Sequence, residues 1–127
     1  MTMTLSEFLE ARIAEDEAVA GTVADGGSGQ WQSWNRSWDP EPVRDIATDG
    51  KRIASVHTTL DEFMCRHDPA RVLAECEAKR RIVERCTGAV AGTVWEHSDT
   101  PVLARATLSD LGLSYADHPD YRQEWRP

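Results

Sequence analysis

The chain has 127 residues and a mass of 14.2 kDa, which is the size of one domain and is enough to bury a core without disulfides or a structural metal. Hydrophobic residues make up 40% of it and the formal net charge is −8, a composition that excludes collagen-like, disordered and disulfide-scaffold classes. Because no apolar run approaches about 20 residues, we expect no membrane span, and we expect a single domain over residues 1–127.

Charge is distributed unevenly along the chain. Residues 1–50 carry a net charge of −7, residues 51–95 carry +2 and residues 96–127 carry −3. An acidic first segment and a basic middle favour pairing within the molecule, and an acidic whole disfavours binding to nucleic acid. An acidic surface that mimics a polyanion is the alternative interpretation.

The cysteines are Cys65, Cys76 and Cys86. An odd number, together with an acidic beginning that is untypical of a signal peptide, predicts free thiols in a reducing cytoplasm. Cys76 and Cys86 would lie about 15 Å apart along one helix, too far to form a bridge. Cys65 and His67 could form a zinc site with His97, but buried thiols are the preferred interpretation, and we expect no cofactor or metal.

The first predicted element is a helix over residues 5–20. Thr4 and Glu7 have the spacing of a capping box, and apolar residues then recur at helical intervals until Gly21, the expected stop. Residues 25–29 are rich in glycine and predict a flexible loop.

A small antiparallel sheet follows. Trp31 predicts a strand near residue 31, and a hairpin over residues 43–56 is indicated by Asp49-Gly50, the sequence of a type I′ turn. A two-residue loop there places Ile46 opposite Ile53 and Val43 opposite Val56.

Helices resume after the hairpin. Thr59 and Glu62 have the spacing of a second capping box before a short helix, and Asp68-Pro69 predicts the start of a long central helix over residues 69–86. Thr100-Pro101 predicts the start of a short helix over residues 101–111. Residues 114–127 predict an extended tail that Tyr115, Tyr121 and Trp125 pack onto the domain. The fold class is therefore α+β, with helices against a small antiparallel sheet.

Three blocks of sequence are distinctive. They are residues 8–17 (FLEARIAEDE), 67–83 (HDPARVLAECEAKRRIV) and 115–127 (YADHPDYRQEWRP). Together they resemble a family of small proteins of unknown function from actinobacteria and their phages. The resemblance implies a cytoplasmic accessory protein and carries no activity, substrate or catalytic residue.

No set of residues indicates catalysis. The sequence has four histidines but no nucleophile-elbow, phosphate-loop, dinucleotide-binding or metalloprotease motif. Aromatic residues near an arginine are the best candidates for binding, because they can stack on a base, a sugar or a peptide. The candidate binding residues are Trp31, Trp34, Trp38, Arg36, His118 and Trp125.

Two functions from different classes remain open. The first is a non-enzymatic binding protein that acts through contacts with a protein partner or as a homodimer. The alternative is a protein that binds a small molecule or a nucleotide, and this class includes enzymes. In it, the Trp31–Trp38 segment and the tail around His118 shape a pocket. In that second case, tryptophan fluorescence should respond to the ligand.

Overall fold

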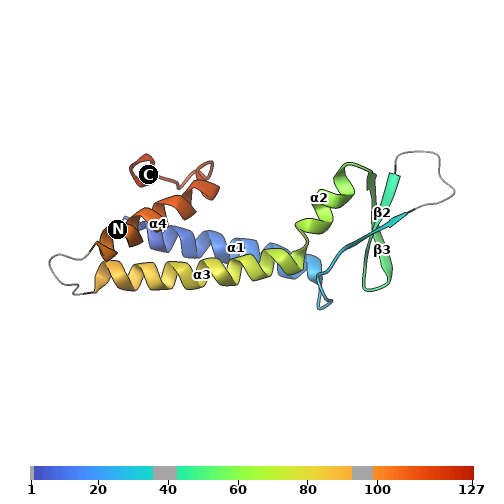
Figure 1. The fold of residues 1–127 in the computed structure, drawn as a ribbon, viewed down its shortest axis with the longest axis horizontal. Coiled ribbons are helices and arrows are strands. Elements are labelled where there is room, and N and C mark those ends of the chain that lie inside the picture. Colours follow the sequence, from blue (N-terminus) through green and yellow to red (C-terminus); the bar gives the residue numbers. More distant parts are fainter. Residues whose placement is uncertain (1, 36–42, 93–98) are drawn as a thin grey trace. The chain divides into compact units, whose positions relative to one another are not determined.

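The computed structural model describes residues 2–35, 43–92 and 99–127 (Figure 1). The chain divides into two units, which we call unit 1 (Met1–Glu15 and Cys76–Pro127) and unit 2 (Asp16–Glu75). The described residues form helices and a three-stranded antiparallel sheet, so the predicted α+β class is confirmed. The elements are α1 (Leu5–Ala24), β1 (Gln32–Asn35), β2 (Val43–Thr48), β3 (Lys51–His57), α2 (Leu60–Arg66), α3 (Pro69–Ala91), α4 (Thr100–Gly112) and the 3₁₀ turns η1 (Leu113–Tyr115) and η2 (Gln123–Trp125).

Helix α1 begins as predicted and ends later. The capping box is formed, because the Thr4 N–H donates to Glu7 Oε2 at 2.8 Å and the Glu7 N–H donates to Thr4 Oγ1 at 3.2 Å. Gly21 does not stop the helix, which continues to Ala24. It ends where Asp25 and Gly26 take positive φ angles of 46° and 75°, a conformation that helical residues cannot adopt.

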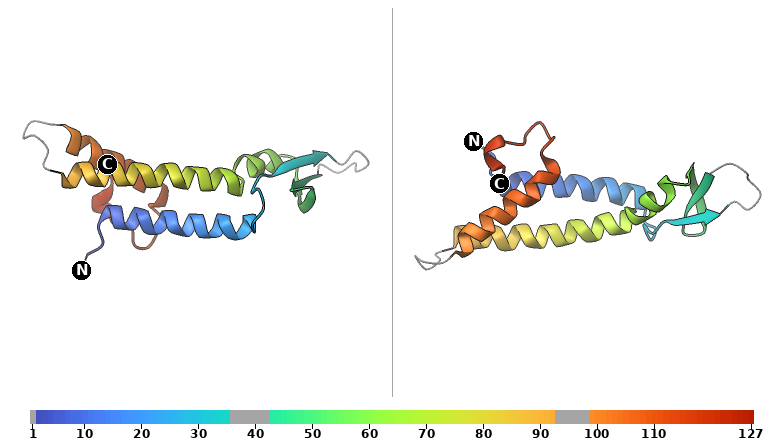
Figure 2. Two further views of the ribbon diagram at one scale, coloured as in Figure 1. Left: turned by 90° about the horizontal axis from the view of Figure 1, so that it is seen from below. Right: turned by 45° about the horizontal axis from the view of Figure 1, so that its top comes forward.

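Unit 1 consists of helical segments and the tail. The beginning of α1, the end of α3 and α4 lie side by side in both views of Figure 2. The buried apolar side chains of this unit are Phe8, Leu9, Ile13, Cys76, Val83, Ala104, Leu108 and Tyr121. Helix α3 runs past residue 86, where the prediction ended it, and the Gly92 N–H continues the helical bonding by donating to the Gly88 carbonyl at 2.8 Å.

Aromatic rings connect the tail to α1. The ring of Phe8, fully buried, lies 6.4 Å from that of Tyr115, 5.9 Å from that of Tyr121 and 5.1 Å from that of Trp125. Gly112, at the end of α4, lies beside the same cluster, and a Cβ at this position would be in ordinary van der Waals contact with Leu5 at 3.4 Å and Tyr121 at 3.5 Å. The pairs of Phe8 with Tyr115 and Tyr121 are edge-to-face, an arrangement that adds to the stabilisation from buried apolar area.

Unit 2 contains the sheet, whose strand order is β1-β2-β3. The hairpin of β2 and β3 is confirmed, and Asp49 and Gly50 have the positive φ angles of 49° and 78° that a type I′ turn requires. The predicted strand near residue 31 is β1, which begins one residue after Trp31.

The predicted register of the hairpin is wrong. Val43 pairs with His57 and Ile46 pairs with Ala54, because the register shifts between Ile46 and Ala47. Ile53 is the extra residue of this bulge and is 47% exposed, whereas Ile46 is fully buried. An inserted residue displaces every later pair by one position, which apolar matching across a turn cannot reveal.

Asp68 begins α3 as predicted. Its Oδ1 accepts the Arg71 N–H at 2.9 Å, and its Oδ2 accepts the N–H of Trp31 at 3.1 Å, so that one buried carboxylate caps the helix and anchors the loop before β1. The same loop is held at Gly29, whose carbonyl accepts the Ala70 N–H at 3.0 Å.

The other two predicted helix caps are not formed. Thr59 precedes α2 without a side-chain capping bond, and its hydroxyl lies 3.2 Å from Nδ1 of His57 instead. The residue before α4 is Asp99 rather than Thr100, again without a side-chain capping bond. Within the described ranges, none of the helices combines the length and the apolar character that crossing a bilayer demands.

Candidate functional site

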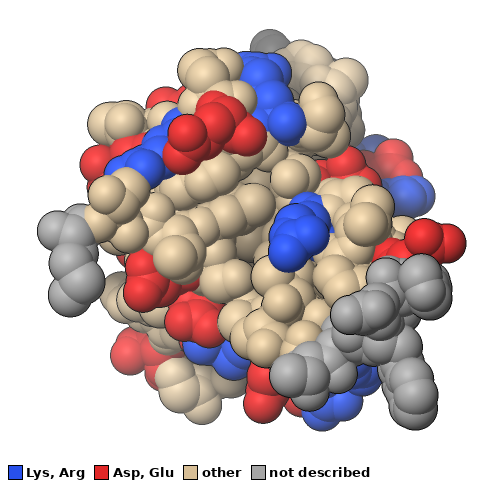
Figure 3. Space-filling model, turned by 90° about the vertical axis from the view of Figure 1, so that its left-hand side faces the viewer, with Lys and Arg blue, Asp and Glu red and all other residues tan. Residues whose placement is uncertain are grey.

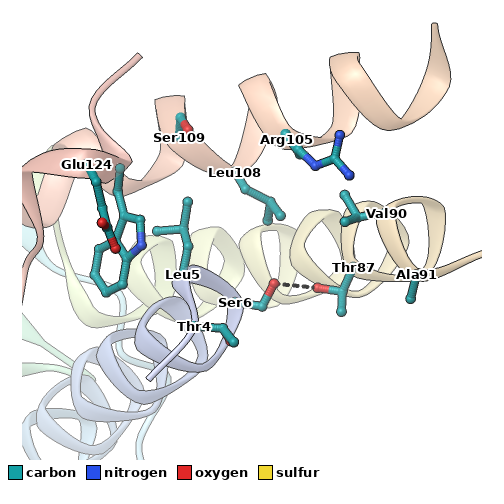
Figure 4. Close-up of a pocket in the computed structure, with 11 residues that line it drawn as sticks. Thr4, Leu5, Ser6, Thr87, Val90, Ala91, Arg105, Leu108, Ser109 and Glu124 are labelled. Atoms are coloured by element: carbon teal, nitrogen blue, oxygen red, sulfur yellow. Dashed lines mark hydrogen bonds between the residues drawn. The ribbon is translucent and has the colours of Figure 1, made fainter. Parts of the chain in front are cut away.

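A pocket of about 430 Å³ opens in unit 1 between the start of α1, the end of α3, α4 and the tail (Figure 4). The residues that line it are Thr4, Leu5, Ser6, Thr87, Val90, Ala91, Arg105, Leu108, Ser109, Glu124 and Trp125. Four segments that are distant in sequence therefore contribute to one site. Its volume lies within the range of about 300–1,000 Å³ that is typical of small-molecule sites.

The inner surface of this pocket is apolar. Leu5 and Leu108 face each other from α1 and α4, and Val90 projects from α3 toward α4 (Figure 4). The indole of Trp125 forms a side wall and is itself held by the ring of Phe8. Because Leu108 is buried and Trp125 is packed from behind, this wall exists before any ligand arrives.

Two hydroxyl groups lie on the α1 and α3 side of the pocket. Ser6 Oγ and Thr87 Oγ1 are 2.8 Å apart and share a hydrogen bond, drawn as a dashed line in Figure 4. Each hydroxyl carries one hydrogen, and only one of the two is used in this bond. The pair thus retains one O–H donor and several lone pairs for another polar group.

The charged groups of the pocket are Arg105 and Glu124. Glu124 has a partner, because its Oε1 lies 3.5 Å from Nη1 of Arg122. Arg105 makes no ion pair or hydrogen bond with another residue of the described ranges. Figure 3 shows this end of unit 1, where an uncharged hollow has a cationic side chain at its margin and acidic groups further out.

His118, a predicted site residue, packs inside unit 1. Its Nδ1 accepts the Asp120 N–H at 3.1 Å and lies 2.8 Å from Nη1 of Arg12, which also contacts Nε2. Phe8 meets the imidazole edge to face at 5.6 Å, and Glu15 pairs with Arg12 at 2.9 Å. Nδ1 accepts a hydrogen bond and therefore carries no proton. Because the imidazole contacts Arg12 and Phe8 of α1, it holds the tail against this helix.

The predicted binding residues that the structure describes divide between the two units. Trp125 lines the pocket and, like His118, contacts Phe8, so these two candidates are brought together around one ring. Trp31 and Trp34 belong to unit 2. Arg36 and Trp38 lie outside the described residues.

Unit 2 has a smaller apolar pocket of about 320 Å³. The residues that line it are Asp16, Val19, Ala20, Val23, Trp31, His67, Pro69 and Val72. Trp31 therefore contributes to a concave surface, whereas Trp34 lies on β1 with 40% of its surface exposed.

The three thiols differ in burial, since Cys76 is buried and Cys65 and Cys86 are partly exposed. All three cysteines are free, and burial raises the pKa of the Cys65 thiol, with the nearby carboxylates of Asp61 and Asp68 acting in the same direction. Within residues 2–35, 43–92 and 99–127, no three His, Cys, Asp or Glu side chains are grouped so that they could hold a metal ion. His97, the third member of the considered zinc site, lies outside these ranges.

Sequence reasoning missed most of the pocket. Ser6 and Thr87 are 81 positions apart and belong to no motif, and Arg105 is one charged residue among many. Only Trp125 gave a signal, because a tail rich in aromatic residues predicts packing. The other lining residues become recognisable when three helices place them around the same space.

These features define a small α+β protein with a pocket in its helical unit. The chain belongs to a family of unknown function, DUF6221, whose model matches residues 2–127. Neither a curated protein nor a solved structure matches the chain.

Proposed function

We propose that this chain is a non-enzymatic binding protein and that the pocket of unit 1 holds the apolar part of a small molecule. The observation that carries the proposal is the pocket of about 430 Å³, whose Leu5, Leu108 and Trp125 offer an apolar surface. An apolar group that binds there is removed from water, which contributes about 25 cal/mol of binding free energy per Å² of apolar surface buried.

The polar chemistry of the pocket supports binding rather than turnover. The hydroxyls of Ser6 and Thr87 hydrogen bond to each other, and an activated nucleophile needs an adjacent base instead. The one carboxylate among the described lining residues, that of Glu124, pairs with Arg122. We therefore assign the pocket residues to positioning a ligand, with no catalytic residue among them.

Contact with a protein partner is a second candidate function, favoured by a different surface. In unit 2, Phe63 of α2 is 63% exposed and Leu60 is half exposed, and none of the residues of α2 is buried. Exposed large apolar side chains of this kind mark interaction sites. The partner would be another protein or a second copy of the chain, in the cytoplasm of an actinobacterium or of a phage-infected cell, and nucleic acid is disfavoured by the net charge of −8.

The pocket can be tested with a neutral, environment-sensitive fluorophore such as N-phenyl-naphthylamine. We expect saturable fluorescence enhancement with the wild-type protein at neutral pH. The variant Val90→Trp should lose at least about tenfold in affinity, since an indole would fill part of the apolar space.

Glu84→Trp is the matched control, because it adds an indole to an exposed position of α3 that does not line the pocket. It should leave the affinity unchanged while both variants keep the wild-type circular dichroism spectrum. Equal binding by Val90→Trp and the wild type would overturn the assignment of the pocket.

A further inference from the structure

The strongest unassigned feature of the pocket is a cationic side chain without a described ion-pair partner. Arg105 is the one basic residue among the described lining residues, and no described carboxylate pairs with it. Glu124, the opposite charge in the lining, is engaged by Arg122 at 3.5 Å. A guanidinium beside apolar surface favours an anionic group that arrives with an apolar body.

We propose that the pocket of unit 1 binds an amphipathic carboxylate, with its apolar body between Leu108 and Trp125 and its carboxylate at Arg105. This proposal rests on the proposed function and adds the charge of the ligand. In Figure 4 the guanidinium reaches from α4 toward Val90, and Arg105 is exposed, so this group lies where the apolar lining meets solvent. A carboxylate at this border stays partly hydrated while its apolar body is buried.

The hydroxyl pair gives the ligand a second polar contact. Ser6 and Thr87 have one O–H donor left after their mutual hydrogen bond, and they lie on the opposite side of the pocket from α4 (Figure 4). A ligand with a hydroxyl or carbonyl group along its body can use this donor. Ligands without such a group would gain only from Arg105 and the apolar walls.

The surroundings favour one negative charge over two. Arg105 is the one cation in the described lining, whereas a phosphate dianion is normally held by several donors. The first turn of α1, which also borders the pocket, is already served by the Glu7 carboxylate through its bond from the Thr4 N–H. The Glu7 carboxylate would repel a dianion beside it more strongly than a monoanion.

The test compares phenylbutyrate with its neutral amide as competitors of N-phenyl-naphthylamine. Wild type should bind the carboxylate about fivefold more tightly than the amide, which corresponds to roughly 1 kcal/mol for an exposed charge-assisted contact. Arg105→Leu should remove this preference while it retains the neutral amide and the neutral fluorophore.

Two controls separate charge from fold. Arg105→Lys should keep part of the preference, and Arg81→Leu should keep all of it, because Arg81 pairs with Glu77 on the exposed side of α3 and does not line the pocket. Raising the ionic strength should reduce the preference in the wild type.

The outcomes distinguish this inference from the proposed function. If the fluorophore binds and Arg105→Leu leaves the ratio of carboxylate to amide affinity unchanged, the charge assignment is wrong and the pocket stands. If the wild type binds neither the fluorophore nor either competitor, the pocket assignment fails and the inference fails with it. Preference for phenyl phosphate over phenylbutyrate would overturn the choice of a monoanion.

Discussion

Unit 1 is stabilised internally by one kind of contact and unit 2 by another. In unit 1 the rings of Tyr115, His118, Tyr121 and Trp125 surround Phe8, so that the tail is fixed to α1 by aromatic packing. In unit 2 several aspartates connect separate segments by accepting hydrogen bonds. They are Asp45 from Ser55, Asp49 from Ser28, Asp61 from Ser33 and Asp68 from Trp31.

The difference shows how one short chain stabilises two kinds of architecture. Helices and a tail can bury rings without needing polar partners, since the helices satisfy their own backbone groups. A three-stranded sheet joined by loops leaves N–H groups at the loop ends, and the carboxylates of Asp49 and Asp68 accept such groups. The carboxylates of Asp45 and Asp61 accept serine hydroxyls instead. We therefore expect unit 1 to be sensitive to lost volume and unit 2 to lost charge.

The largest effect is expected for Phe8→Ala in unit 1. Removal of this fully buried ring should lower the free energy of unfolding by about 3–5 kcal/mol. Hydrogen exchange should then accelerate at Trp125 and Arg126, whose N–H groups donate within the tail. Val19→Ala, at an exposed position of α1, is the control and should cost less than about 1 kcal/mol. Unchanged exchange in the tail would contradict the central role of Phe8.

A smaller effect is expected for Asp68 in unit 2. Asp68→Ala removes both the cap of α3 and the anchor of Trp31, so the free energy of unfolding should fall by about 2 kcal/mol in urea titrations. Asp68→Asn keeps one acceptor oxygen and should cost about half as much.

Glu62→Gln provides the comparison for this experiment. It removes an exposed carboxylate that pairs with Arg66 on the surface of α2 and should change stability by no more than about 0.5 kcal/mol. If Asp68→Ala behaved like Glu62→Gln, the carboxylate would not be an anchor of unit 2.

The smallest effect concerns acid. Hydrogen bonds from Ser28 lower the pKa of Asp49, and the hydrogen bond from Ser33 lowers the pKa of Asp61. The unfolded chain therefore binds protons more readily than the folded one. The stabilisation of the folded state by these two hydrogen-bonded carboxylates is fully present above the ordinary aspartate pKa of about 3.9. It is lost as the pH falls through the lowered pKa values.

Carboxyl chemical shifts recorded during an NMR titration should show these lowered pKa values directly. Ser28→Ala should move the pKa of Asp49 back toward its ordinary value and leave that of Asp61 unchanged. Ser33→Ala should have the reverse effect. If Asp49 had the same pKa in the wild type and in Ser28→Ala, the Ser28 hydroxyl would not be a cause of the lowered pKa.

Local signals in the sequence were sufficient for much of the fold. The capping box at Thr4, the Asp68-Pro69 start of α3 and the Asp49-Gly50 turn depend on neighbouring residues only, and the structure contains all three. The bulge at Ile53 depends on how two strands fit against the rest of unit 2, so that a pattern within the hairpin could not predict it.

The candidate site was less accessible to such reasoning. Trp125 was identified because tryptophan is costly to expose and favourable to pack. Arg105 could not be distinguished from other arginines until its lack of a described partner and its place beside Leu108 were known. A site assembled from the ends of several helices leaves no spacing to recognise.

The outer border of the sheet has a consequence for how the molecule behaves at high concentration. Strand β3 lies at one side of the sheet, and a long, flat strand in that position can recruit a strand from another molecule and start aggregation. Here the irregular pairing at Ile53 interrupts the flat ladder, and Lys51 and Arg52 place two cations at its beginning. Both features oppose strand recruitment, which protects the chain while it leaves Ile53 in contact with water.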